Sequence, residues 1–296
     1  MVKSKGTIIE EIKELLSEPK NRIKLDDFVT EHLKKFINMT SLKQFPVQDS
    51  NAQKEEFLER LQKYEEILKD LQKIVILLAR WGNEEQLLIL EKVFNRITET
   101  DKISSGLDLW VRFGWYPIQV LMYSSGIAAL SARKYSALKI ILTANVPYSS
   151  MREEYFPIIV PVTENLAHIN DEFKWIPGQD QKHVPRSEHL FEILDPVLQE
   201  LLFLGKDYER LFDDFEVYAA LVYGDLKERN WYPIGRFGWK YRRGTGYDPF
   251  NRIVEEGKKR KDEWPPLQTG MFNDSLERFL EVSESLRQWL SELPWL

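Results

Sequence analysis

The sequence predicts an all-α protein built from many helices. Apolar residues recur at helical spacing through most of the 296-residue chain, whereas sustained alternation of apolar and polar residues is rare. Hydrophobic residues make up 43% of the chain and aromatic residues 12%, which is enough for a large core and excludes a disordered chain. We therefore expect a multi-helical fold of two helical lobes with irregular loops rich in proline and glycine.

Two amphipathic helices are expected near the N-terminus, over residues 7–17 and 25–37, where apolar residues recur three and four positions apart. The clearest pattern comes next. Seven apolar residues from Phe57 to Leu78 alternate four and three positions apart, which is a heptad seam of about three repeats. A seam of this kind packs against a partner helix, either within the chain or in a second copy, so oligomerisation through it stays open.

The seam helix is predicted to continue into a helical hairpin. Gly82 suits a left-handed C-terminal cap, and Asn83 can cap the next helix together with Gln86 three residues later. Apolar residues continue at helical spacing as far as Ile97. We therefore expect an αα-hairpin whose shorter second arm covers part of the seam.

The longest uncharged window, residues 113–132, has the length of a membrane span of about 20 residues. It contains Pro117, Gln119, Gly126 and several serines, but few bulky aliphatic residues. Small and hydroxyl residues permit close helix packing in water as well as in lipid. We favour a buried central helix over a membrane span, with membrane association as the alternative.

Prolines concentrate between residues 145 and 183, and this segment is expected to connect the two lobes. It includes a short strand or extended loop over residues 155–162, where two prolines prevent a central strand. A helix capped by Ser187 and a helix capped by Asp207 follow, and a last helix begins near Ser275. The expected parts are an N-terminal lobe with the hairpin, a connector and a C-terminal lobe: residues 1–144, 145–183 and 184–296.

The composition excludes several kinds of chemistry. The chain has no cysteine, so disulfide scaffolds, thiolate metal sites and cysteine nucleophiles are excluded, and its four histidines are dispersed. No phosphate-binding Walker loop, serine-hydrolase elbow or paired-histidine zinc helix occurs in the sequence. We expect no catalytic residues, no metal and no cofactor, and a reducing cytoplasmic location without a secretory signal.

One segment departs from the average charge. The chain carries 41 basic and 47 acidic residues, a net charge of −6, yet residues 231–261 contain nine basic and three acidic residues. Aromatic residues and glycines are interleaved with these charges. Guanidinium groups bind phosphate or carboxylate through paired hydrogen bonds, and aromatic faces stack on bases. This composition is typical of a surface that binds an anion, a nucleic acid or a partner protein.

Three interpretations remain open for this segment, which is expected to be an irregular loop. Its aromatic residues can pack a lid onto the core while its arginines pair with the acidic helix of residues 207–216. Alternatively, it binds an acidic partner protein, or it binds a nucleic acid or nucleotide. The candidate binding residues are basic or aromatic: Arg236, Trp239, Lys240, Tyr241, Arg242, Arg243, Lys258, Lys259 and Arg260.

Four carboxylates cluster on the helix predicted over residues 207–225: Glu209, Asp213, Asp214 and Glu216. No histidine and no second carboxylate-bearing helix accompany them in the pattern of a two-metal site. They are therefore interpreted as a solvated face or an arginine-binding face.

Part of the chain resembles uncharacterised helical modules of bacterial and archaeal proteins. The resemblance rests on WVRFGWYPIQVLMYSSGIAALSARKYSALKIIL, on SEHLFEILDPVLQELLFLGKDYERLFDDFEVYAALVYGDL and on YPIGRFGWKYRR, all within residues 107–243. Those modules often follow an effector or nucleotide-related domain of the kind associated with antiviral defence. We expect no such domain in this chain, so the resemblance implies a sensor, adaptor or regulator that acts with a separate partner. It transfers no functional residues.

The sequence therefore predicts a non-catalytic helical interaction or regulatory protein that binds a partner protein or nucleic acid through residues 231–261. The alternative is a nucleic-acid-processing or nucleotide-binding enzyme that combines this segment with the carboxylates of the 207–225 helix. The two hypotheses differ in whether the purified protein converts a nucleic acid or nucleotide or only retains it.

Overall fold

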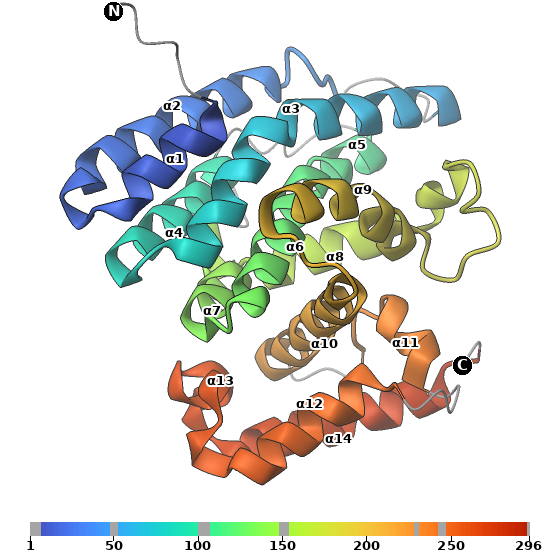
Figure 1. Cartoon of the computed structure of the whole chain (residues 1–296). Coiled ribbons are helices and arrows are strands. Elements are labelled where there is room, and N and C mark those ends of the chain that lie inside the picture. The colour runs from blue at the N-terminus through green and yellow to red at the C-terminus, as the bar shows by residue number, and fades with distance from the viewer. Residues whose placement is uncertain are drawn as a thin grey trace, which may run out of the picture.

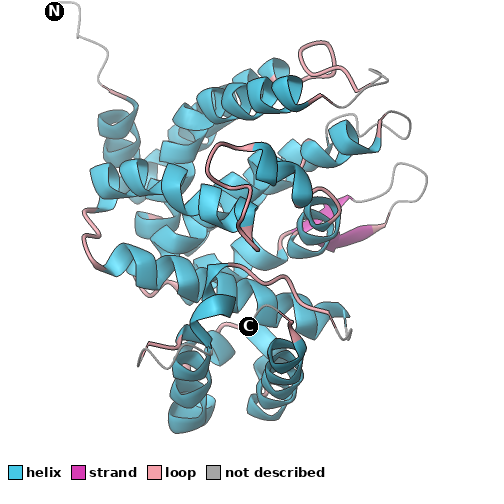
Figure 2. Cartoon of the chain, turned by 90° about the vertical axis from the view of Figure 1, so that its right-hand side faces the viewer, coloured by secondary structure: helices cyan, strands magenta, loops and turns pink. Residues whose placement is uncertain are grey.

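The computed structural model describes residues 7–47, 53–99, 107–147, 154–227, 231–241 and 247–294. This described part is all-α, as predicted: helices follow one another along the chain, and its one sheet has two short strands (Figure 1, Figure 2). Residues from the first helix to the last contribute to one hydrophobic cluster.

The N-terminal part contains the two expected amphipathic helices, the long seam helix and its second arm. Asn83 and Gln86 form the expected capping box, in which each backbone N–H donates to the other residue's side-chain oxygen at 2.9 Å. The αα-hairpin is therefore confirmed. These helices are α1 (Ile8–Ser17), α2 (Arg22–Met39), α3 (Lys54–Trp81) and α4 (Glu84–Glu99), with the short 3₁₀ helix η1 (Pro19–Asn21) after α1.

Gly82 ends α3, but the predicted left-handed cap is wrong, because its φ is −57° and its ψ is 137°. A Cβ atom at this position would lie 2.6 Å from the Leu78 carbonyl oxygen. Glycine is required here because the backbone of residue 82 passes too close to the Leu78 carbonyl to leave room for a side chain. A positive φ is not the reason.

The uncharged window forms a buried helix near the centre of the molecule, as predicted. Nearly all residues of α6 (Tyr116–Ser131) are buried, and a helix buried on all sides is apolar all round. A Cβ atom at Gly126 would overlap the Phe215 ring, so this glycine allows a close helix crossing. None of the described helices is both long and apolar enough to span a membrane. The helices that pack on α6 are α3, α7 (Tyr135–Thr143), α8 (Ile159–Ala167), α9 (Pro185–Leu202) and α10 (Asp207–Lys227).

The predicted connector, residues 145–183, folds against the rest of the molecule. Its β1 (Asn145–Pro147) pairs antiparallel with β2 (Tyr155–Pro157), whereas residues 159–167 form α8 and not an extended segment. Val146 is fully buried, so the segment contributes to the core. The division into two lobes at these boundaries stays a prediction. The connector also contains the 3₁₀ helix η2 (Asp171–Trp175), and the short helix α5 (Asp108–Phe113) precedes α6.

Most described residues of the segment 231–261 are helical, so the prediction of a loop there is wrong. Asp248 caps the second of its helices, since its Oδ1 accepts from the Asn251 N–H at 2.9 Å and Pro249 occupies the first turn. The elements after α10 are α11 (Arg236–Tyr241), α12 (Pro249–Arg260), η3 (Lys261–Glu263), α13 (Pro265–Gln268), η4 (Met271–Asp274) and α14 (Leu276–Glu292).

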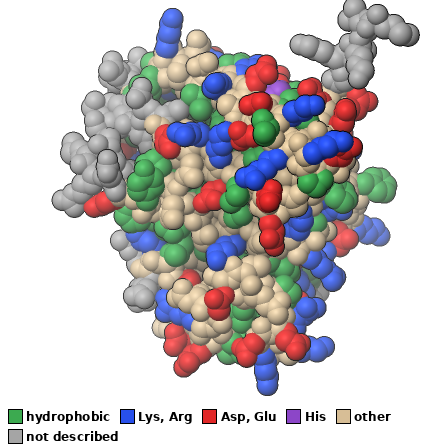
Figure 3. All heavy atoms as spheres, turned by 90° about the vertical axis from the view of Figure 1, so that its left-hand side faces the viewer, with side chains coloured by type: hydrophobic (Ala, Val, Ile, Leu, Met, Phe, Trp, Pro, Cys, Tyr) green, Lys and Arg blue, Asp and Glu red, His purple; other side chains and the backbone are tan. Residues whose placement is uncertain are grey.

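The heptad seam of α3 is buried within this chain. Phe57, Leu68 and Val75 have no exposed surface, and α1, α2 and α6 pack against this helix. On the side of α1, α2 and α4, basic and acidic side chains are interspersed over the surface (Figure 3). Oligomerisation through the seam stays a prediction.

Candidate functional site

Helix α10 organises the candidate site, because three of its carboxylates are buried. Asp213 has no exposed surface, and Asp214 and Glu216 are 5% and 3% exposed. Successive residues of an α-helix point about 100° apart, so Asp214 points away from Asp213, whereas Glu216, three positions later, lies only about 60° from Asp213. The solvated acidic face expected as one alternative from the sequence is therefore wrong. The arginine-binding face is confirmed for Asp214, which pairs with Arg210 and Arg252.

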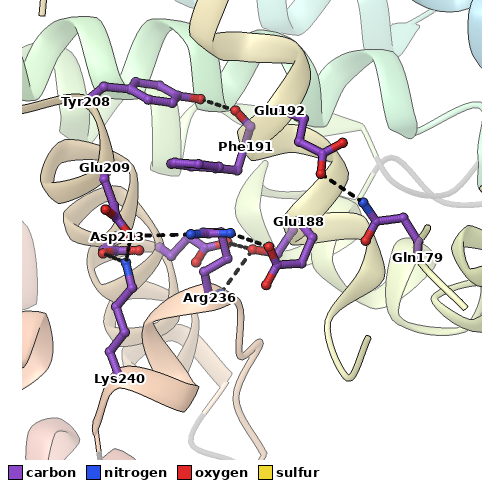
Figure 4. A network of polar contacts seen from close by, with 11 residues as sticks. Gln179, Glu188, Phe191, Glu192, Tyr208, Glu209, Asp213, Arg236 and Lys240 are labelled. Carbon is purple, nitrogen blue, oxygen red and sulfur yellow. Dashed lines mark hydrogen bonds and ion pairs between the residues drawn. The ribbon is translucent and has the colours of Figure 1, made fainter. Parts of the chain in front are cut away.

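Asp213 belongs to a buried ion network, which consists of Glu188, Glu209, Asp213, Arg236 and Lys240 (Figure 4). Lys240 donates to the Asp213 carboxylate and also to Glu209, whose Oε1 lies 2.7 Å from Nζ. Arg236 pairs with Glu188, and its Nη2 lies 3.4 Å from Glu209 Oε1. The network therefore ties α11 to both α9 and α10.

Arg236 is also fixed by neighbours outside this network. Its guanidinium carbon lies 3.8 Å from the centre of the Phe191 ring, a cation–π contact. Its backbone N–H donates to the Ser187 hydroxyl at 3.0 Å. The side chain and the backbone of Arg236 together hold the start of α11 against α9.

The charge of Lys240 is what keeps Asp213 ionised at neutral pH. Burial raises the pKa of Asp213 to about 6, and the nearby Lys240 ammonium limits this rise. The hydrogen bond from Lys240 holds the pKa of the half-exposed Glu209 below its usual 4.5. Asp213 Oδ1 accepts no hydrogen bond from any described residue. Among the described residues, Lys240 and then Arg236 are the positive charges that compensate this carboxylate.

The candidate binding residues within 236–241 are buried or half-buried, because α11 packs against the rest of the molecule. Arg236 and Lys240 are 9% and 5% exposed, and both are engaged by carboxylates of the buried ion network. Trp239 is half-buried, with its ring centre 5.1 Å from the Lys240 Nζ. Tyr241 is half-buried and packs its ring at 6.0 Å from that of Phe250.

The other candidate binding residues lie elsewhere. Lys258, Lys259 and Arg260 are exposed in the last turn of α12, where positive charge is favoured by the helix dipole. Lys258 lies 2.9 Å from Glu255, and Arg260 lies 3.3 Å from Glu256. Arg242 and Arg243 lie outside the described residues.

Asp214 faces a second surrounding, a cleft of about 480 Å³ between the ends of α3, α6 and α9 and the helices α10 and α12. We call it the arginine cleft. Three carboxylates line it, so its arginines leave an excess of two positive charges. These carboxylates are Asp207, Asp214 and Glu256, and the arginines are Arg80, Arg133, Arg210, Arg252 and Arg260.

The arginines of the cleft differ in how far they are compensated. Arg210 and Arg252 both donate to Asp214, the former across 3.2 Å. Arg80 donates to the Ser131 hydroxyl, and neither it nor Arg133 forms an ion pair with a described carboxylate. The excess positive charge is therefore concentrated at the ends of α3 and α6.

Two residues at the edge of the arginine cleft have left-handed backbone conformations. The φ of Arg133 is 55° and that of Phe203 is 51°. Phe203 is 93% exposed, although it is large and apolar. Outside glycine, the left-handed region costs free energy, and residues held in it cluster at ligand-binding sites. Phe203 is the C-terminal cap of α9, where left-handed residues are common. Its exposed ring thus lies beside two arginines that form no ion pair with a described carboxylate.

Glu216 faces the third surrounding, a pocket of about 230 Å³ lined by residues of α6, α8, α9, α10, α14 and residues 231–235. We call it the Glu216 pocket. Glu216 Oε1 accepts from the Tyr123 hydroxyl at 3.2 Å and from the Ser187 hydroxyl at 2.5 Å. Its Oε2 is buried and accepts nothing from the described residues.

The local sequence around the Glu216 pocket is fitted to this carboxyl group. Ser187 is not the cap predicted for α9, because the helix begins at Pro185 and the hydroxyl points to Glu216 instead. A Cβ atom at Gly235 would overlap the Glu216 carboxyl, so only glycine allows the chain to pass there. Burial raises the pKa of Glu216 to about 7, although the hydrogen bond from Ser187 lowers it.

The described residues contain no group of three or more histidines and carboxylates arranged to hold a metal ion. No protein-family model, curated protein or solved structure matches this chain. The resemblance to helical modules of defence proteins therefore stays an expectation.

Sequence reasoning missed most of the arginine cleft. Arg80, Arg133 and Arg210 belong to three separate helices or their ends. Of the three, Arg133 alone stands in a locally basic stretch, with Lys134 and Lys139 nearby and no acidic residue between them. Arg252 and Arg260 did lie within the basic segment, so the charge count found one wall of the cleft. That the other walls meet this one depends on how distant helices pack, which the sequence does not show.

Proposed function

We propose that this protein is a non-catalytic binding protein that recognises a nucleic-acid strand through its phosphates and a base in the arginine cleft. The observation that carries the proposal is the convergence of five arginines on a cleft of about 480 Å³ beside an exposed aromatic ring. Two of these arginines, Arg252 and Arg260, come from the segment for which the sequence predicted nucleic-acid or partner binding.

The charges of the cleft suit a phosphate. Guanidinium groups present a planar fork of donors that matches the oxygens of a phosphate, and they stay charged at any physiological pH. Arg80 and Arg133 have no carboxylate among the described residues to compete with such a ligand. Arg210 and Arg252 are held in place by Asp214, so this side of the cleft is ordered before a ligand arrives.

The ring of Phe203 favours a nucleotide unit over a simple anion or an acidic peptide. An exposed aromatic face stacks on a base, which contributes about 1–3 kcal/mol per base in single-strand binding proteins. The cleft volume falls in the range of about 300–1,000 Å³ that is usual for small-molecule sites, which leaves room for one nucleotide at a time. A sensor or regulator of the kind implied by the resemblance would use such a site to detect a strand.

Reversing the two uncompensated charges tests the proposal. We expect Arg80→Glu combined with Arg133→Glu to weaken binding of a labelled single-stranded oligonucleotide on the order of tenfold or more, because each lost contact is charge-assisted. The salt dependence should also become shallower, by about 1.4 in the slope of log K against log salt concentration for two single-strand phosphates. Fluorescence anisotropy at several salt concentrations measures both.

The matched control is Lys24→Glu combined with Lys34→Glu, which makes the same charge change on exposed positions of α2. This control should keep most of the affinity. Equal losses in the two double variants, or no oligonucleotide binding by the unmodified protein, would overturn the proposal. Binding of an acidic peptide in place of the oligonucleotide would favour the partner-protein interpretation. Turnover of the strand or of a mononucleotide would favour the enzyme alternative.

Phe203→Gly separates the binding role of the ring from its structural role. Glycine adopts the left-handed conformation without strain, so the thermal unfolding midpoint should not fall. The affinity for the oligonucleotide should fall about tenfold, because the stacking surface is lost. Phe203→Tyr keeps an aromatic face and should bind like the unmodified protein. If Phe203→Gly binds the oligonucleotide as tightly as Phe203→Tyr, the ring has no part in recognition.

A further inference from the structure

The Glu216 pocket lies outside the arginine cleft and takes no part in the proposed function. Its volume is about 230 Å³, and five helices and residues 231–235 contribute to its walls. Most of its lining is apolar or aromatic, with a few polar groups. Among the lining residues are Met122, Ile159, Val162, Phe215, Trp231 and Trp289. This combination of apolar walls and few polar groups is typical of small-molecule sites.

Two buried acceptor atoms in the lining have no donor within the described residues. Glu216 Oε2 is one of them, and the amide oxygen of Gln119, a side chain of α6 that is 7% exposed, is the other. A buried polar atom without a partner costs about 1–3 kcal/mol, which a donor from a ligand would offset. The pocket therefore presents acceptors that a ligand with N–H donors would satisfy.

The carboxyl group of Glu216 is held in a fixed orientation. Tyr123 and Ser187 both donate to its Oε1, whereas its Oε2 has no donor among the described residues. The Ser187 hydroxyl in turn accepts from the Arg236 N–H at 3.0 Å, so its proton is directed to Glu216. The absence of a side chain at Gly235 gives this carboxyl its space. A binding group ordered in this way loses little freedom when a ligand arrives.

Aromatic walls suit a cationic donor. Trp231 and Trp289 are half-buried and both line the pocket. The faces of tryptophan rings attract ammonium groups, which strengthens binding of a cation near a carboxylate. The apolar side chains of α6 and α8 would cover an apolar body attached to that cation.

We propose that the Glu216 pocket binds a primary amine that carries an apolar group, with the ammonium held by Glu216 Oε2 and Gln119 Oε1. Arg186 also lines the pocket, where it donates to the Leu166 carbonyl oxygen. Its guanidinium offers a place for a carboxylate, so the same pocket can take an amine or an amino acid. Both sources share the ammonium group on which the proposal rests.

The titration of Glu216 supports this geometry. Burial raises the pKa of Glu216 to about 7, and a bound ammonium favours the ionised carboxylate. Amine affinity should therefore fall as the pH is lowered from 8 to 5, because binding must then remove a proton from Glu216. The other titratable or charged groups around the pocket among the described residues are Tyr123 of α6, His183 before α9, Arg186 at the start of α9, Asp213 of α10 and Arg236 of α11.

The experiment uses the full chain with three probes that share a phenyl group: phenethylamine, phenylalanine and 3-phenylpropionate. Titration calorimetry at pH 8 gives the affinities, and the fluorescence of the tryptophans in the pocket gives a second readout. We expect phenethylamine to bind and 3-phenylpropionate not to bind. Tighter binding of phenylalanine than of phenethylamine would support the proposal and would indicate that Arg186 binds the carboxylate of the amino acid. No binding of either amine, or equal binding of 3-phenylpropionate, would overturn it.

Two substitutions and one control assign the binding to these acceptors. Glu216→Gln keeps the shape of the side chain and should weaken phenethylamine binding on the order of tenfold to a hundredfold, and Gln119→Leu about fivefold. Glu200→Gln makes the same chemical change on the exposed surface of α9 and should leave the affinity unchanged. Thermal melts show that each variant is folded. Undiminished binding by folded Glu216→Gln would overturn the proposal.

Discussion

Replacing Lys240 with methionine should lower the free energy of unfolding by about 3 to 5 kcal/mol at pH 8. Methionine fills a similar volume but removes the ammonium that donates to Asp213 and Glu209. Asp213 has no exposed surface, so its ionised carboxylate would be left buried without a compensating charge. Urea unfolding followed by circular dichroism measures this loss.

The pH dependence of this loss identifies its cause. Burial already raises the pKa of Asp213 to about 6 with Lys240 present, and removing Lys240 should raise it further. A protonated carboxyl group is much less costly to bury, so the destabilisation by Lys240→Met should be smaller at pH 5 than at pH 8. A loss that does not change with pH would instead indicate a packing defect.

A matched control and a rescue complete the test. Lys258→Met makes the same substitution at an exposed position of α12 and should change stability by less than about 0.5 kcal/mol. Combining Lys240→Met with Asp213→Leu should restore most of the lost stability, because an apolar pair often replaces a buried ion pair without loss. If Lys240→Met is as mild as the control, Lys240 is free to bind an external anion, as the sequence alone allowed.

Replacing Glu216 with glutamine should raise the free energy of unfolding by about 3 kcal/mol at pH 8. Burial raises the pKa of Glu216 from its usual 4.5 to about 7, so the folded state binds the proton more tightly than the unfolded chain. The resulting stabilisation is fully present below pH 4.5 and is lost as the pH rises through 7. A shift of this size corresponds to about 3 kcal/mol at 1.36 kcal/mol per pH unit.

The comparison of the two proteins over pH gives the measurement. Unfolding by urea should show similar stability at pH 4, where Glu216 is protonated in both states, and a growing advantage of Glu216→Gln up to pH 8. The glutamine amide oxygen can still accept from Tyr123 and Ser187, so these two hydrogen bonds are kept. Equal stability of the two proteins at every pH would show that the carboxyl group is not buried as described. A gain in stability in Glu216→Gln would show that the ionised carboxylate does not stabilise the fold at pH 8.

Much of the fold could be predicted from the sequence because its signals are local. The heptad spacing within α3 and the capping pair Asn83 and Gln86 depend on residues only a few positions apart. The start of α12 also has a local signal, because Asp248 caps the helix and Pro249 occupies its first turn, although the composition of the segment predicts a loop. Gly82 could be predicted as the end of α3, but its conformation could not, because that depends on the direction in which the chain leaves the helix.

The candidate sites could be predicted only in part, because each joins residues that are far apart in the chain. Arg252 binds Asp214 across 38 positions, and Arg236 binds Glu188 across 48. The basic segment was correctly identified as unusual, and pairing with the acidic helix was one of its open interpretations. The composition alone does not show whether these basic residues pair with carboxylates of the chain or form an exposed binding surface.

By itself, the sequence determined the all-α architecture, the hairpin and the buried character of α6, since these follow from periodicity and from the absence of charge. Only the tertiary structure decided whether each charged side chain is buried in an ion pair or exposed to water. Lys240 and Lys258 belong to the same basic segment, yet one is buried against Asp213 and the other is exposed. The free energy of a charged group depends on how far it is removed from water and on which charge lies beside it, and both are fixed only when distant helices meet.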